Sequence, residues 1–138
     1  MALFAGAEGA YGVFQWITGA AKILWMEKTA YLDSATGTLV NRNHFAMLLY
    51  LGLGCSLSLL VRDSHESQRP ARGDPSLAER WLASRTTLAL MVGLQLAGIV
   101  ASKSRAGLLA GLLVLLPCVP ALLRGNRTVR LVALAVLA

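Results

Sequence analysis

Charged residues are scarce in this 138-residue chain: they make up 14% of it, whereas soluble domains average about 25%. Apolar residues account for 56% of the sequence, and the mean hydropathy is +0.59. This balance excludes an ordinary soluble domain and indicates a membrane protein. A membrane protein of this length has room for about four spans of ~20 residues each, with their loops.

Cysteine is scarce as well, and the motifs of most catalytic sites are missing. Cys55 and Cys118 lie inside apolar runs, without the spacing of a zinc site or a disulfide framework. No catalytic triad, phosphate-binding loop or metal cluster is readable, so we expect no cofactor and no metal. The net charge is +6, but the sequence has no basic stripe with interleaved aromatic residues, so we expect no nucleic-acid binding. The arginines lie in loops between apolar runs, so the positive charge is better explained by membrane topology and by contact with anionic lipid.

The two ends of the chain lack the features of complete membrane segments. No Lys or Arg stands between Met1 and the first apolar run, so the start does not resemble a signal peptide. The last apolar run, residues 131–138, is too short to cross a bilayer. We therefore expect a truncated chain, in which Met1 is an internal start.

Apolar runs divide the chain into a single, incomplete transmembrane region. The expected fold class is all-α, a polytopic transmembrane helix bundle. The runs predict spans at residues 45–61, 86–101 and 106–123, a possible partial span at 2–18 and a truncated span at 131–138. Loops or turns are predicted at residues 19–44, 62–85, 102–105 and 124–130.

Basic residues assign these loops to the two sides of a membrane. Loops 62–85 and 124–130 share one side and hold eight Lys or Arg residues, against five in loops 19–44 and 102–105. The positive-inside rule therefore places the first pair in the cytoplasm and the second pair outside. Spans 45–61 and 106–123 both run inward, so both present a helix N-terminus, the positive end of the helix dipole, to the outer face.

Each of these two N-termini carries an arginine and a capping residue. Asn41 or Asn43 can cap the first helix beside Arg42, and Ser104 can cap the other beside Arg105. Free backbone N–H groups, a positive dipole and a guanidinium together favour an anion, and two such ends could clamp a diphosphate.

Simpler interpretations of the same residues stay open. Arginines that flank spans are usually interfacial anchors, and the remaining arginines are interpreted in that way. His44 is either a hydrogen-bonded structural residue or a base, and His65 is expected to be solvated. Glu8 is either a buried functional acid or part of a loop rim.

Three motifs carry a resemblance to a known family. They are AEGAYGVFQWITG at residues 7–19, TGTLVNRNHFA at 36–46 and SRAG at 104–107. In this order and spacing they resemble the bacterial O-antigen ligase family, which includes polysaccharide polymerases and protein O-oligosaccharyltransferases. Residues 47–50, MLLY, depart from the pattern that usually follows the second motif.

The resemblance implies a glycosyltransferase of the bacterial inner membrane, multi-pass, of which this chain is a fragment. Such enzymes move a glycan from undecaprenyl diphosphate to a hydroxyl of a lipid, glycan or protein at the periplasmic face, without a metal. Arg42 and Arg105 are the implied donor-binding residues. The supporting residues would be Asn41, Asn43, His44, Lys103 and Ser104, and His44 is a weak candidate for the catalytic base.

The family has many more spans and a periplasmic loop with a catalytic histidine further along, so the fragment is expected to be inactive alone. The alternative is a non-catalytic membrane module or remnant that binds polyprenyl diphosphate or assembles with other helices. A transporter that uses Glu8 as an intramembrane charge is a third interpretation.

Overall fold

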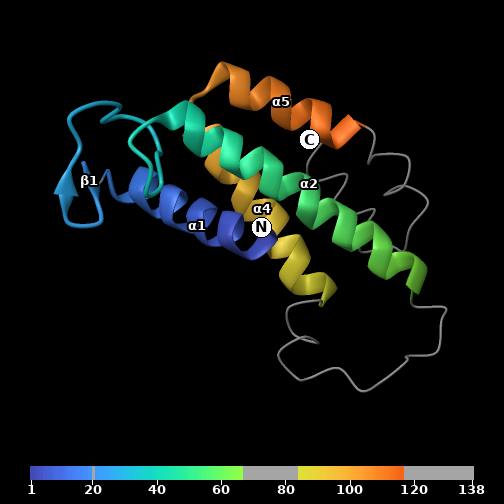
Figure 1. Ribbon diagram of the computed structural model, residues 1–138. Coiled ribbons are helices and arrows are strands. Elements are labelled where there is room, and N and C mark those ends of the chain that lie inside the picture. Colours follow the sequence, from blue (N-terminus) through green and yellow to red (C-terminus); the bar gives the residue numbers. More distant parts are fainter. Residues whose placement is uncertain (20, 67–83, 117–138) are drawn as a thin grey trace.

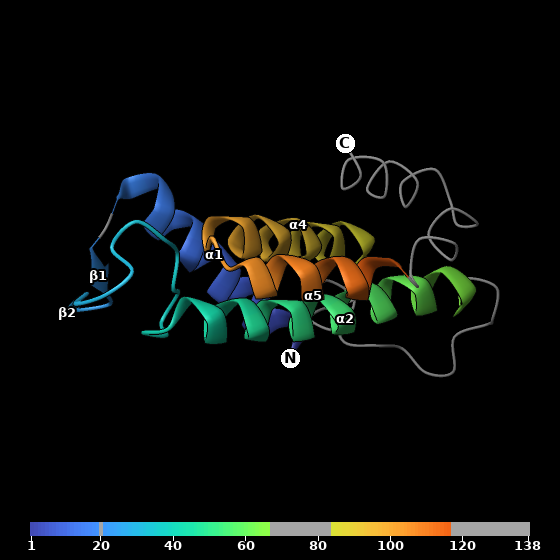
Figure 2. The same ribbon diagram turned by 90° about the horizontal axis from the view of Figure 1, so that it is seen from above.

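The computed structural model of the protein describes residues 1–19, 21–66 and 84–116. It has four helices in these ranges: α1 (Ala2–Thr18), α2 (Arg42–Glu66), α4 (Arg85–Ala101) and α5 (Arg105–Leu115). The helices lie lengthwise beside one another; α1 and α4 run in one direction, and α2 and α5 run in the other (Figures 1 and 2). The predicted elements within 67–83 and 117–138 fall outside the described residues.

The core forms around one face of α2. Phe45, Leu49 and Leu53 follow one another at intervals of four residues and are fully buried, as expected for one stripe of a helix. Leu88, Val92 and Ile99 of α4 complete the same cluster. The Phe45 ring lies so close to Gly12 of α1 that a Cβ there would overlap it. Small residues thus allow α1 and α2 to approach closely at the end where the polar motifs lie.

A short β-hairpin joins the end of α1 to the loop before α2. Strand β1 (Lys22–Ile23) pairs antiparallel with β2 (Met26–Glu27). The Tyr11 hydroxyl of α1 accepts a hydrogen bond of 2.7 Å from the Leu24 N–H and so fixes the hairpin turn. The all-α prediction missed this hairpin, because two-residue strands leave no readable alternation in the sequence.

The predicted polytopic transmembrane bundle is wrong for the part of the chain that the structure describes. By length and composition, α2 is the one described helix that could cross a membrane, over Arg42–Arg62. Helix α4 has 17 residues, which is about 26 Å, and α5 is described over 11 residues. Both are shorter than the ~30 Å apolar layer of a bilayer. The prediction counted each apolar run as a span, although the run at 86–101 is itself shorter than a bilayer needs, and α4 adds one residue to it.

Large apolar side chains cover much of the outer surface of the helices. A water-soluble monomer rarely exposes apolar groups so densely. The exposed large side chains of the helices are Leu3, Phe4, Phe14, Trp16, Ile17, Met47, Leu51, Leu59, Leu90, Val100, Leu108, Leu109, Leu112 and Leu113. The hairpin adds Leu24, Trp25 and Met26, of which Trp25 is 83% exposed. This distribution fits an apolar surrounding better than water.

Candidate functional site: two helix N-termini at one end of the bundle

The N-termini of α2 and α5 are capped by the residues that the sequence indicated. The Asn41 side-chain oxygen accepts a hydrogen bond of 2.8 Å from the Asn43 N–H. The Ser104 hydroxyl oxygen accepts one of 3.1 Å from the Gly107 N–H. Both caps are confirmed, and each satisfies one of the free donors in the first turn of its helix.

A direct hydrogen bond joins these two helix ends. The Ser104 hydroxyl, which caps α5, donates to the side-chain oxygen of Asn43 in the first turn of α2 at 2.9 Å. Arg42 and Arg105 are the first residues of the two helices. The structure therefore places two positive helix ends and two arginine backbones side by side, from segments more than sixty residues apart in the chain.

The two arginines have different surroundings. The Arg42 guanidinium carbon lies 5.0 Å from the centre of the Tyr31 ring, within the range of a cation–π contact. The Arg42 Nε is buried and has no hydrogen-bond partner among the described residues. Arg105 is exposed, and so is His44 in the first turn of α2. A bound anion could therefore reach Arg105 directly, while Arg42 is held by stacking.

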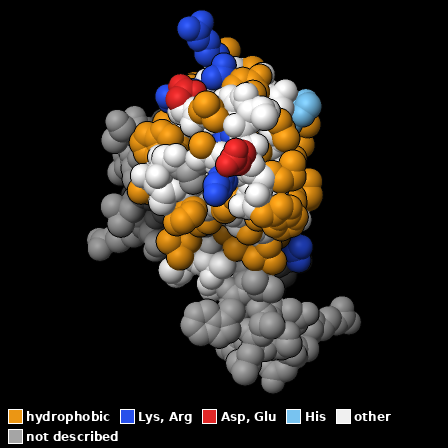
Figure 3. Space-filling model, turned by 90° about the vertical axis from the view of Figure 1, so that its left-hand side faces the viewer, with side chains coloured by type: hydrophobic (Ala, Val, Ile, Leu, Met, Phe, Trp, Pro, Cys, Tyr) orange, Lys and Arg blue, Asp and Glu red, His pale blue; other side chains and the backbone are white. Residues whose placement is uncertain are grey.

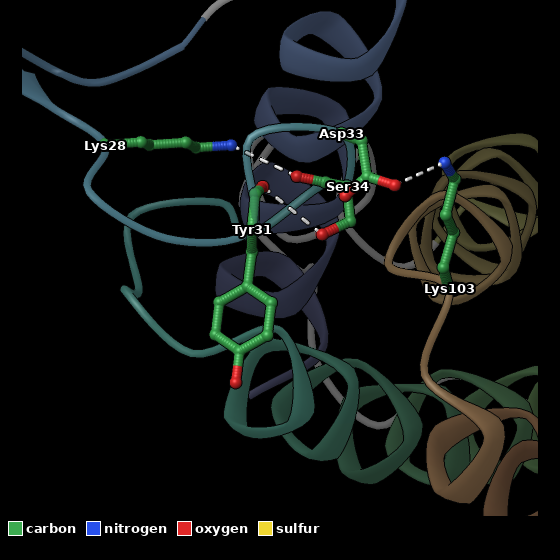
Figure 4. A network of polar contacts seen from close by, with 5 residues as sticks. All are labelled: Lys28, Tyr31, Asp33, Ser34 and Lys103. Atoms are coloured by element: carbon green, nitrogen blue, oxygen red, sulfur yellow. Dashed lines mark hydrogen bonds and ion pairs between the residues drawn. The ribbon is translucent and has the colours of Figure 1, made fainter.

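The loop before α2 carries an ordered polar network (Figure 4). Lys28 is buried as a residue, and its ammonium donates to the Ser34 carbonyl at 3.1 Å. Burial lowers the pKa of the Lys28 amine below its ordinary value. The Ser34 hydroxyl donates to the Tyr31 carbonyl at 3.3 Å. The Ala35 N–H donates to the Ala101 carbonyl at 2.9 Å and ties this loop to the end of α4.

The same loop places an acid among the cations of this end. Asp33 and Lys103 form an ion pair of 3.0 Å between segments seventy residues apart. The hydrogen bond and the charge of Lys103, with a smaller contribution from the Arg42 charge, hold the pKa of Asp33 below its ordinary value. Acidic and basic side chains lie among apolar ones on this end of the molecule (Figure 3).

Sequence reasoning missed the residues that hold the TGT segment (residues 36–38) in place. The Glu8 carboxylate of α1 accepts 2.9 Å and 2.7 Å hydrogen bonds from the N–H and hydroxyl of Thr38. The Gln15 amide donates to the Gly37 carbonyl at 3.0 Å and accepts from the Thr36 N–H at 3.4 Å. Glu8 and Gln15 are seven residues apart in an apolar segment, hence on one face of the helix. That spacing could have revealed them as a pair.

These contacts explain much of the three motifs in structural terms. Glu8 and Gln15 of the first motif form hydrogen bonds with the TGT segment of the second. Phe45 packs against Gly12 and Gly37. Asn43 of the second motif binds Ser104 of the third. Glu8 itself lies in α1 and is buried, with 6% of its surface exposed, and its two carboxylate oxygens bind Thr38, so these contacts hold the loop that precedes α2.

The N-termini of α2 and α5, with Arg42, Lys103 and Arg105, form a cationic end of the molecule. Within residues 1–19, 21–66 and 84–116, no three His, Cys, Asp or Glu side chains lie together in a way that could hold a metal ion. Comparison of the chain with family models, curated proteins and solved structures found no match. The helix N-termini and the cations of this end suit an anion.

Proposed function

We propose that the chain is part of a membrane glycosyltransferase of the O-antigen ligase type, and that its α2–α5 end binds the diphosphate of a polyprenyl-linked glycan. The observation that carries the proposal is the Ser104–Asn43 hydrogen bond, which holds the two N-termini beside each other. A diphosphate has two phosphoryl groups, so each helix end and its arginine can take one of them. The three motifs of the resemblance meet at this same end.

The proposed location is the bacterial inner membrane, with the Arg42 and Arg105 end at the periplasmic face. Helix α2 is long and apolar enough to cross a bilayer. Exposed apolar side chains surround the helices, and the hairpin with exposed Trp25 lies at the same end as the two N-termini (Figure 1). Tryptophan at that level suits the headgroup region of a bilayer.

The chemistry follows from the charge that develops when the glycan leaves. As the sugar–oxygen bond breaks, the diphosphate takes up negative charge, which positive groups placed beforehand can stabilise. Arg42 and Arg105 have this role in the proposal, as paired guanidinium groups suited to phosphate oxygens. The acceptor hydroxyl must also lose a proton to a base. His44 is the exposed described histidine at this end, and its role as that base is part of the proposal.

A binding test uses the whole chain in lipid nanodiscs, with undecaprenyl diphosphate as the probe. Arg42→Ala and Arg105→Ala should each weaken binding about tenfold or more, because each removes charge-assisted hydrogen bonds of about 1.5–3 kcal/mol. Arg85→Ala is the matched control. Arg85 also begins a helix directly after a capping serine, Ser84, but at the opposite end of the bundle. Equal affinities in all three variants would refute the site.

A non-catalytic membrane module is the second candidate, and a specific observation favours it. The motif residues Glu8, Gln15, Asn43 and Ser104 all make structural hydrogen bonds, which a binding or assembly module would need as much as an enzyme. The two candidates differ in turnover. Transfer of glycan from a polyprenyl diphosphate donor to an added acceptor by the full-length protein, lost in Arg105→Ala, supports the enzyme. Binding without transfer by the full-length protein supports the module.

A further inference from the structure

The Asp33–Lys103 ion pair lies inside the cationic end rather than beside it. Lys103 directly precedes Ser104, the residue that caps α5 and binds Asn43 of α2. Asp33 lies two residues after Tyr31, whose ring stacks with Arg42. Figure 4 shows the Asp33 carboxylate pointing from the loop to the Lys103 ammonium at the turn between α4 and α5. One loop therefore contacts two of the cations at this end.

Several observations separate this contact from an ordinary surface ion pair, which adds little to stability. The loop is fixed on both sides of Asp33, by the Lys28–Ser34 hydrogen bond and by the Ala35–Ala101 backbone bond. Lys103 is held at a left-handed backbone position, φ 52°, which a residue other than glycine rarely adopts. The Arg42 charge also lowers the pKa of Asp33, so the carboxylate lies in the field of both cations.

We infer that Lys103 is a third cationic ligand of the diphosphate site, and that the Asp33 carboxylate competes with the bound anion for it. The inference rests on the proposed function of this end. Asp33 and Lys103 are both exposed, with 72% and 49% of their side-chain surface accessible. An incoming phosphoryl group can therefore reach the ammonium without a rearrangement of the core. Binding exchanges one anionic partner of Lys103 for another.

This exchange gives Asp33 a role in specificity. A phosphodiester headgroup of a membrane lipid carries one negative charge, like the carboxylate, so it gains little by displacing Asp33. A polyprenyl diphosphate carries more charge and two sets of phosphate oxygens, so it can contact Lys103 while holding both helix ends. Asp33 thereby disfavours singly charged phosphates, which are abundant in a bilayer, and favours the diphosphate.

The test compares the affinities for undecaprenyl diphosphate and for phosphatidylglycerol, measured on the whole chain in zwitterionic nanodiscs. Asp33→Asn should reduce the preference for the diphosphate about three- to fivefold, the effect of one exposed charge pair. Asp33→Glu keeps the carboxylate and should keep most of the preference. In a Lys103→Met background, Asp33→Asn should change the preference little, because the cation for which the carboxylate competes is gone.

The outcomes separate this inference from the proposed function. An unchanged preference in Asp33→Asn, in a chain whose diphosphate binding depends on Arg42 and Arg105, overturns the inference alone. A reduction of the preference by Asp33→Asn that is equally large in the Lys103→Met background also overturns the inference, because Asp33 would then act without Lys103. If the wild-type chain binds no polyprenyl diphosphate, the proposed function fails and the inference fails with it.

Discussion

The addition of one methyl group at Gly107 should push α5 away from α2. Gly107 lies in the first turn of α5, and its N–H is held by the Ser104 hydroxyl. A Cβ on Gly107 would overlap the Cβ of Ala46, which is fully buried in α2. Because the Ala46 Cβ is attached directly to the backbone, no side-chain rotation can relieve the overlap. Gly107→Ala must therefore shift one helix relative to the other.

The expected cost can be estimated from two opposing effects. Alanine is favoured over glycine in a helix interior by about 1 kcal/mol. Overpacking of a close contact costs about 1–3 kcal/mol, and more where the backbone must move. We expect Gly107→Ala to lower the free energy of unfolding by roughly 2 kcal/mol. Gly93→Ala in α4 is the matched control, since nothing lies within 4 Å of its Cβ position. It should raise stability by about 0.5–1 kcal/mol.

The assay is equilibrium unfolding in detergent, paired with the nanodisc binding of undecaprenyl diphosphate. Gly107→Ala should weaken binding as well, because a shift of α5 stretches the Ser104–Asn43 hydrogen bond. The compensating Ala46→Gly should restore both properties in the double variant, since it moves the methyl group from one helix to the other. The reasoning fails if Gly107→Ala is as stable as Gly93→Ala, or if Ala46→Gly makes the double variant worse.

Two further predictions concern the acids at this end. Glu8→Leu should destabilise the fold by about 1–3 kcal/mol, because the N–H of Thr38 would lose its acceptor. Unfolding of this variant beside wild type checks it, and equal stability would contradict it. The pKa of Asp33 is held down by Lys103, so the ion pair stabilises the fold above the ordinary pKa of 3.8 and is lost as the pH falls through the lowered value. Lys103→Met should raise the Asp33 midpoint in a carboxyl NMR titration, and an unmoved midpoint would show that Lys103 is not the cause.

The sequence predicted the caps of this site because capping is local. Asn41 and Ser104 each stand directly before the first residue of a helix, and the side chain of each accepts a hydrogen bond from the first turn of that helix. Alternation of helix direction then predicted that the two N-termini lie at one end, and the Ser104–Asn43 bond places them there. Helix α2 extends beyond the predicted 45–61 to Arg42–Glu66, because polar residues can continue a helix past its apolar stretch.

Other features depended on the path of the chain in space, which residue spacing does not reveal. The Tyr31–Arg42 stacking and the Asp33–Lys103 pair arise because the loop before α2 folds back over the α4–α5 turn. The count of membrane spans failed for a different reason. Apolar composition marks burial, whether in protein or in lipid, and the predicted runs 86–101 and 106–123 correspond to helices α4 and α5, which are shorter in their described parts than a bilayer.

The central claim is that the first residues of α2 and α5 hold a diphosphate together. Its most direct test is phosphorus–nitrogen dipolar dephasing by solid-state NMR, on the chain in bilayers of a phosphorus-free glycolipid, with undecaprenyl diphosphate as the sole source of phosphorus and with ¹⁵N in the arginine guanidinium groups. We expect dephasing that shows direct contact in wild type and in Arg85→Lys, reduced in Arg42→Lys or Arg105→Lys and absent in the double variant. Dephasing that survives in the double variant, or is missing from wild type, would contradict the claim.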